Sequence, residues 1–171
     1  MSAVPPLVKI TVGVVVERSK STSAWADYYW RPANALPGVP DTQPWSKLSE
    51  DGERASFYVG SAEVALHRTE TANYRDNLQS GAPLLWVVLE PTGSEPPFKL
   101  VLVTADPAEG EAMTEAGANL VDTVPMPTPV QEAIAAFVAE HHVEHQDFVK
   151  RKRDRANPEA MARRGPPLER K

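Results

Sequence analysis

The sequence has no cysteine among its 171 residues. This absence excludes disulfide bridges, thiolate zinc sites, iron–sulfur ligation and cysteine nucleophiles, and it favours a cytoplasmic location. A chain of this length amounts to about one domain and can bury roughly two thirds of the surface that its unfolded form exposes. Folding therefore needs no covalent cross-link.

Long apolar runs are also missing. Runs such as residues 84–89 have the length of a strand, whereas a helix that spans a membrane needs about 20 apolar residues. The N-terminus has neither the basic segment nor the small-residue cleavage site of a signal peptide. We therefore expect a soluble, cytoplasmic protein without a membrane partner.

Signatures of catalysis are absent as well. The chain has no G-x-S-x-G, phosphate-loop or G-x-G-x-x-G sequence, and its serine, histidine and acidic residues suggest no triad. The sequence therefore predicts no catalytic residue and no cofactor. An enzyme of unrecognised type stays the third alternative, behind two kinds of binding protein.

Hydrophobic periodicity predicts the fold class. Apolar side chains fall on every second residue from Val8 to Val16, which is the period of a strand with one buried face. Similar patterns predict strands at 28–36, 57–66, 84–90, 98–104 and 120–124, and helices at 69–80, after Asp106 and after Thr128. Asp106 and Thr128 are each followed by a proline, so we expect them to cap these helices. We also expect Pro32 to confine its strand to an edge or shorten it, Gly60 to mark a bulge or tight turn, and the strands at 84–90 and 98–104 to form a hairpin. The order predicts an α+β domain: a mostly antiparallel sheet or partly closed barrel, with short inserted helices and a C-terminal helix.

Charge divides the chain into two parts. Residues 150–171 carry nine basic and three acidic side chains, whereas residues 1–149 carry nine basic and 20 acidic ones, a net charge of −11. We expect a single domain over 1–149 and a basic, partly disordered tail over 150–171. The acidic domain opposes approach to a polyanion, so a nucleic-acid partner is not expected.

One short pattern resembles a metal site. His141 to His145 contains the H-x-x-E-H spacing of inverted zinc peptidases, and His141 and His145 would share one face of a helix. A third ligand and a substrate cleft have no evident source in the remaining residues. His141 also follows Phe137 by four residues, so we expect a half-buried histidine at the edge of the core and no metal site.

Aromatic and arginine residues suggest a binding surface. Alternation along a strand places Tyr28 and Trp30 on one face and Tyr29 and Arg31 on the other. Exposed Trp, Tyr and Arg are the residue types that anchor interfaces, although sheet packing explains the same aromatics equally well. The predicted partner-binding residues, on this strand and on the polar helix at 69–80, are Trp25, Tyr28, Tyr29, Trp30, Arg31, Asn73, Tyr74 and Arg75.

Three segments, at 25–32, 70–78 and 104–111, together resemble a family of small uncharacterised bacterial proteins encoded beside formate dehydrogenase and molybdopterin-cofactor accessory genes. The resemblance extends over roughly residues 7–155 and brings no catalytic residues with it. It implies a non-catalytic accessory protein in the maturation or assembly of a molybdenum or tungsten formate dehydrogenase. The implied partner is a subunit of that enzyme or a molybdoenzyme maturation protein.

A second function of a different class stays open. The protein would bind a pterin-type cofactor or another anionic small molecule directly, with an aromatic ring stacked on the heterocycle and an arginine on its phosphate. The arginines available for this role are Arg18, Arg31, Arg68 and Arg75. Such a function requires a pocket beside one of them.

Overall fold

The computed structural model describes residues 6–22, 27–115 and 117–142. The elements in chain order are β1 (Val8–Lys20), β2 (Tyr28–Pro37), β3 (Ser46–Asp51), β4 (Arg54–Leu66), the one-turn helix η1 (Arg68–Glu70), α1 (Thr71–Leu78), β5 (Leu84–Pro91), β6 (Phe98–Thr104), α2 (Pro107–Glu115), β7 (Leu120–Pro125) and α3 (Thr128–His141). The predicted strands and helices are therefore all present. β3 is an additional strand that the sequence patterns did not predict.

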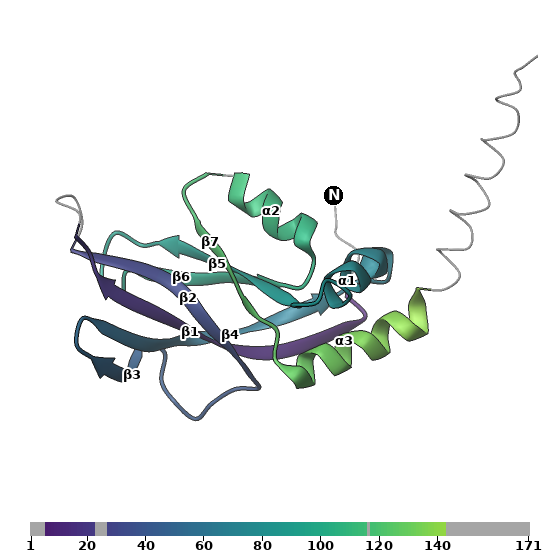
Figure 1. Cartoon of the computed structure of the whole chain (residues 1–171), viewed down its shortest axis with the longest axis horizontal. Helices are drawn as coiled ribbons and strands as arrows, with labels where there is room; N and C mark the ends of the chain where they lie inside the picture. The colour runs from purple at the N-terminus through teal and green to yellow at the C-terminus, as the bar shows by residue number, and fades with distance from the viewer. Residues whose placement is uncertain (1–5, 23–26, 116, 143–171) are drawn as a thin grey trace, which may run out of the picture.

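The strands form two antiparallel sheets, in the orders β2-β1-β4-β3 and β6-β5-β7 (Figure 1). The predicted α+β class, antiparallel pairing and C-terminal helix are thus confirmed. The alternative of a partly closed barrel is wrong, because the two sheets are hydrogen-bonded separately. The predicted hairpin of β5 and β6 belongs to the smaller sheet, in which β5 is central.

The alternation of β1 places its apolar row in the core. Val12, Val14 and Val16 are completely or almost completely buried, as expected for the inner face of a central strand. Among the described strands, β2 pairs with β1 alone and therefore lies at an edge, where Pro32 removes no hydrogen bond from the interior of the sheet. A predicted irregularity at Gly60 is also confirmed, since the register of β1 and β4 shifts beside it.

One core lies between the sheets and the helices. Inner residues of β1, β4 and β5 meet the apolar stripe of α3, formed by Val130, Ile134, Phe137 and Val138. α2 covers the outer face of the smaller sheet, where Gly110 packs directly on the indole of Trp86. In Figure 1, α1 and α3 lie at one end of the molecule and β3 at the other.

The two predicted helix starts differ in their caps. Asp106 caps α2 as expected, because its Oδ1 accepts a hydrogen bond of 3.0 Å from the amide of Ala108. Thr128 is already inside α3, and the cap position is Pro127, which has no side chain to accept a bond. The predicted threonine cap is therefore wrong, although the helix is present.

Candidate functional site

The candidate site lies at one end of the core, where a cation replaces an apolar side chain. Arg18 is in phase with Val12, Val14 and Val16 on β1, and it pairs across the sheet with Trp30 and Ala55. The apolar row of the strand therefore ends in a guanidinium. The Arg18 side chain is 22% exposed, so most of it is enclosed by its neighbours.

Aromatic rings enclose this guanidinium. Its central carbon lies 4.3 Å from the ring centroid of Tyr28, 5.2 Å from that of Phe57 and 5.9 Å from that of Trp30. All three distances are within the range of cation–π attraction. β1, β2 and β4 thus each contribute to one arrangement, although Arg18 and Phe57 are far apart in sequence.

Trp30 is the centre of the aromatic cluster. Its ring centroid lies 5.9 Å from that of Trp45, 5.7 Å from Phe57 and 6.0 Å from Phe98. The contacts with Trp45 and Phe98 are edge-to-face, a favoured geometry for aromatic pairs. Because Phe98 belongs to the smaller sheet, the cluster joins both sheets at this end of the core.

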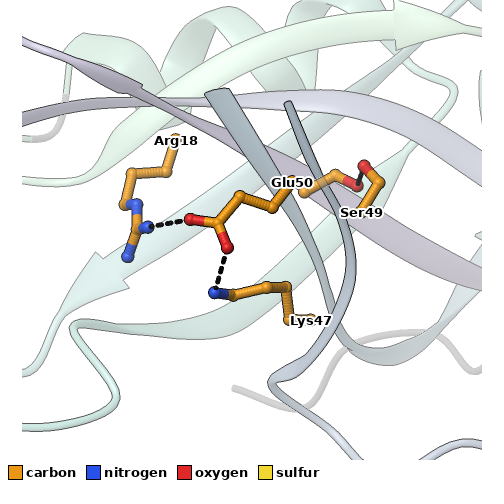
Figure 2. A network of polar contacts seen from close by, with 5 residues as sticks. Arg18, Lys47, Ser49 and Glu50 are labelled. Atoms are coloured by element: carbon orange, nitrogen blue, oxygen red, sulfur yellow. Dashed lines mark hydrogen bonds and ion pairs between the residues drawn. The ribbon is translucent and has the colours of Figure 1, made fainter. Parts of the chain in front are cut away.

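A carboxylate on β3 partly balances the cation. Figure 2 shows Glu50 between Arg18 and Lys47. Glu50 Oε1 accepts a hydrogen bond of 2.9 Å from Lys47 Nζ, whereas its Oε2 lies 3.9 Å from Arg18 Nη2, beyond hydrogen-bond distance. The hydrogen bond and positive charge of Lys47, together with the charge of Arg18, lower the pKa of Glu50 below its usual value. Glu50 is therefore ionised at neutral pH.

The cluster surrounds an open pocket of about 460 Å³. Its lining is formed by Arg18, Tyr28, Trp30, Trp45, Phe57, Glu95, Pro96 and Pro97. Trp45 adopts a φ of 70°, a conformation unusual for a bulky residue that costs on the order of 1–3 kcal/mol, and its amide donates to the carbonyl of Tyr58. The surrounding structure thus holds the backbone of one pocket residue in a strained conformation.

A second cavity, of about 500 Å³, lies between the start of α1 and the start of α2. Its acidic residues already have local partners. Asp106 caps α2 and accepts a bond of 3.0 Å from Asn73 Nδ2, and Glu109 accepts one of 2.6 Å from Thr104. Among the residues that the structure describes, no three metal-ligating side chains lie close enough to hold an ion. We therefore assign this cavity a structural role.

Comparison with known protein families shows to which family the chain belongs. Residues 11–153 match the profile of a family described as protein of unknown function (DUF3305). The chain belongs to this family. No significant match was found among curated proteins, and none among solved structures. The family assignment carries no activity, so the site has to be interpreted from its own residues.

The structure brings together some of the predicted binding residues. Tyr28 and Trp30 face the pocket, whereas Arg31, on the other face of β2, forms an ion pair of 3.2 Å with Glu17. Tyr29 is 62% exposed and does not line the pocket. Trp25 lies outside the described residues. The predicted alternation of this strand therefore separates a pocket face from an outer face.

The predicted residues on α1 form no common surface with those on β2. β1 and β4 run between them: Arg18 pairs near the start of β4, and Val8 pairs with Leu66, just before η1. Ten residues of strand separate the two positions, or about 33 Å. The predicted binding residues on β2 and those on α1 therefore lie in separate parts of the molecule.

Packing explains much of the polarity of α1. Tyr74 is 1% exposed and lies in the core, against the ring of Phe137. Burial raises the pKa of Tyr74 to about 12, while the bond from the amide of His67 acts in the opposite direction. Asn73 Nδ2 donates a hydrogen bond to Asp106 Oδ1, and Arg75 is half-buried. Tyr74 in particular offers no side chain to a partner.

The described histidines at the end of α3 lie at the edge of the core. His141 is half-buried, and its ring centroid lies 4.6 Å from that of Phe137, as the sequence predicted. His145 and the basic tail lie outside the described residues. His142, which the sequence did not single out, is buried and shares a hydrogen bond of 2.8 Å with Thr71.

None of the described helices is long and apolar enough to cross a membrane.

The predicted binding residues did not include Trp45, Phe57 and Glu50, which the structure places around Arg18. A usable signal existed only for Arg18, because it continues the alternating row that begins at Val8. A charged residue in phase with a core row indicates that the core opens to solvent at that point. Glu50 lies on the unpredicted strand β3, so no pattern could place it beside Arg18.

Proposed function

We propose that the protein is a non-catalytic binding protein that acts in the maturation or assembly of a molybdenum or tungsten formate dehydrogenase. The pocket around Arg18 is its contact surface. The observation that carries the proposal is a guanidinium held among three aromatic rings at the open end of the core. The choice of enzyme rests on the resemblance of the three sequence segments.

The composition of the pocket favours binding over catalysis. Its lining combines rings, prolines and one arginine with a single carboxylate, Glu95. A catalytic site would need a nucleophile beside a base, or an acid and a base within reach of one reacting atom. The lining instead contains the residue types that dominate the energetics of interfaces, which are Trp, Tyr and Arg.

Affinity capture from the native host tests this function. The bait is the tagged full chain, compared with an Arg18→Gln variant and with Arg68→Gln as a matched control, because Arg68 is exposed at the other end of the molecule. We expect the wild type and the control to recover a formate dehydrogenase subunit or a molybdoenzyme maturation protein. Arg18→Gln should recover about tenfold less, the loss expected for an interface anchor.

Two results of the capture experiment would contradict the proposal in different ways. If neither class of protein is recovered while an unrelated bait captures its known partner, the proposed function is wrong. If recovery is equal for wild type and Arg18→Gln, the partner binds elsewhere on the molecule. Thermal unfolding of each purified variant shows that a loss of capture is not a loss of folding.

Direct binding of a pterin-type cofactor or another anionic small molecule is the second candidate. The volume of the pocket and the position of Arg18 beside the indole of Trp30 favour it, because a stacked heterocycle could place an anionic group on the guanidinium. Titration with released pterin cofactor or with guanosine monophosphate, followed by tryptophan fluorescence, tests this idea. A saturable change supports it, and the absence of one leaves the protein partner alone.

A further inference from the structure

We propose that the pocket selects a carboxylate carried beside an aromatic side chain on a partner protein, and discriminates against a phosphate in the same place. The inference rests on the proposed function as a binding protein and specifies what its pocket recognises. Three features carry it: the orientation of Arg18, the charges around it and the open shape of the pocket.

Arg18 is held as a receptor for a planar anion. The short distance of 4.3 Å to the Tyr28 centroid, with Phe57 at 5.2 Å, fixes the guanidinium among the rings. Within the described part of the chain its only ion-pair partner is Glu50, at 3.9 Å. The N–H donors therefore retain capacity for an incoming group, and their fork matches a carboxylate in two-bond geometry.

The neighbouring charges limit how much negative charge the pocket tolerates. Arg18 and Lys47 are balanced by Glu50, which is bonded to Lys47, and by Glu95 in the lining. A carboxylate adds one negative charge to this set. A phosphate monoester adds up to two at neutral pH. Its attraction to the two cations and its repulsion from the two glutamates both double, so the balanced set gives it no net electrostatic gain. Its loss of hydration beside the aromatic rings costs more than that of a singly charged carboxylate.

The walls of the pocket select what accompanies the carboxylate. Trp30, Trp45 and Pro97 present apolar surface, and proline offers no amide donor to a ligand. Because the pocket is open at the end of the core, it would leave much of a free small molecule in water. A side chain on a partner surface is covered by the partner itself. We therefore infer an acidic residue next to an aromatic one in a protein segment.

Peptides and labelled protein test this selectivity. The probes are Ac-Gly-Phe-Asp-Gly-NH2 and its analogues with asparagine or phosphoserine in place of the aspartate. Binding is followed by the indole N–H signals in nitrogen-15 NMR spectra of the full chain. Signals of Trp30 and Trp45 should shift saturably with the aspartate peptide, while Trp86, which packs under α2, serves as an internal control and stays unchanged.

We expect the aspartate peptide to bind most tightly and the phosphoserine peptide to bind with an affinity lower by about threefold or more. The asparagine peptide should cause no saturable shift. Arg18→Gln should abolish the shifts. Glu50→Gln should narrow the gap between the phosphoserine and aspartate peptides, because it removes one repulsive charge while Arg18 stays. Binding of the phosphoserine peptide as tightly as the aspartate peptide, or saturation by the asparagine peptide, overturns the proposal.

This experiment is independent of the partner's identity. Peptide selectivity without capture of a formate dehydrogenase subunit or maturation protein would retain the recognition chemistry and reject the assigned pathway. Capture that depends on Arg18, without peptide selectivity for the carboxylate, would retain the proposed function and reject this inference. A tenfold loss of capture by Arg18→Gln combined with the expected peptide order supports both.

Discussion

The helix-covered part of the molecule, with α1, α2 and α3, and the open end around Arg18 both place polar groups beside apolar ones. At the helix-covered part, the hydroxyl of Tyr74 and the carboxylate of Asp106 have hydrogen-bond partners within the fold. At the open end, Arg18 meets its only described counter-charge at 3.9 Å. Satisfied polar groups stabilise the fold, whereas a cation with spare donors among aromatic rings is available for recognition.

If this contrast is correct, substitutions in the helix-covered part should mainly change stability, and substitutions at the open end should mainly change binding. Four predictions follow the contrast from its largest expected effect to its smallest. The three substitutions are each compared with a matched position that should respond less.

The largest effect is expected where α2 meets the smaller sheet. In Gly110→Ala the new Cβ would lie 2.2 Å from Trp86 Cγ, so the helix or the indole has to move. We expect a loss of about 3 kcal/mol in the free energy of unfolding from overpacking, although alanine is the better helix former by about 1 kcal/mol. Urea unfolding measures the change. Glu111→Ala, at an exposed position of the same helix, should stay within about 0.5 kcal/mol. Equal stability of Gly110→Ala and wild type would contradict the packing.

The second effect concerns the buried hydroxyl of Tyr74. Tyr74→Phe leaves the amide of His67 without its partner at 2.9 Å, so we expect a loss of about 1–2 kcal/mol at pH 7. The variant should also respond less to alkali. Because the folded pKa is raised to about 12, the wild type loses stability as pH rises from about 10 to 12, by at most about 3 kcal/mol.

Urea unfolding at pH 7, 10 and 11 tests both parts of this prediction. Tyr29→Phe is the matched control, because Tyr29 is exposed on β2 and should change stability little at any of these pH values. A wild type and a Tyr74→Phe variant that lose stability in parallel above pH 10 would show that Tyr74 does not cause the alkaline loss.

The third effect, at the open end, should be small for stability. Tyr28→Ala removes one cation–π contact of Arg18, which is worth about 0.5–1 kcal/mol, from a residue that is 43% exposed. Tyr29→Ala, on the opposite face, should stay within about 0.5 kcal/mol. Thermal unfolding measures both. A loss of about 3 kcal/mol for Tyr28→Ala, as in a core truncation, would make this end structural and remove the contrast.

The smallest effect is expected for the basic tail. A chain that ends at Val149 lacks the nine basic side chains of residues 150–171, and we expect its free energy of unfolding to change by only a few tenths of a kcal/mol. If the tail instead contacts an acidic partner, association with that partner should become slower and less sensitive to salt. A markedly lower unfolding temperature of the shortened chain would show that the tail packs on the domain.

Much of the fold could be predicted from local patterns. The alternating row from Val8 predicts β1, Pro32 predicts an edge strand, and Asp106 followed by proline predicts the start of α2. In each case the physical cause is local: side-chain period, the missing proline amide and a capping carboxylate. β3 was not predicted because it is an exposed edge strand, whose side chains need not alternate between apolar and polar.

The amino-acid sequence by itself therefore determined the elements, the α+β class and the phase of Arg18 on its strand. Only the tertiary structure decided that the strands form two sheets, that Tyr74 is buried and that Trp45, Phe57 and Glu50 surround Arg18. These features depend on pairing between segments far apart in the chain, which local periodicity does not encode. The candidate site is a product of strand register, since a shift of one residue would turn Arg18 away from the rings.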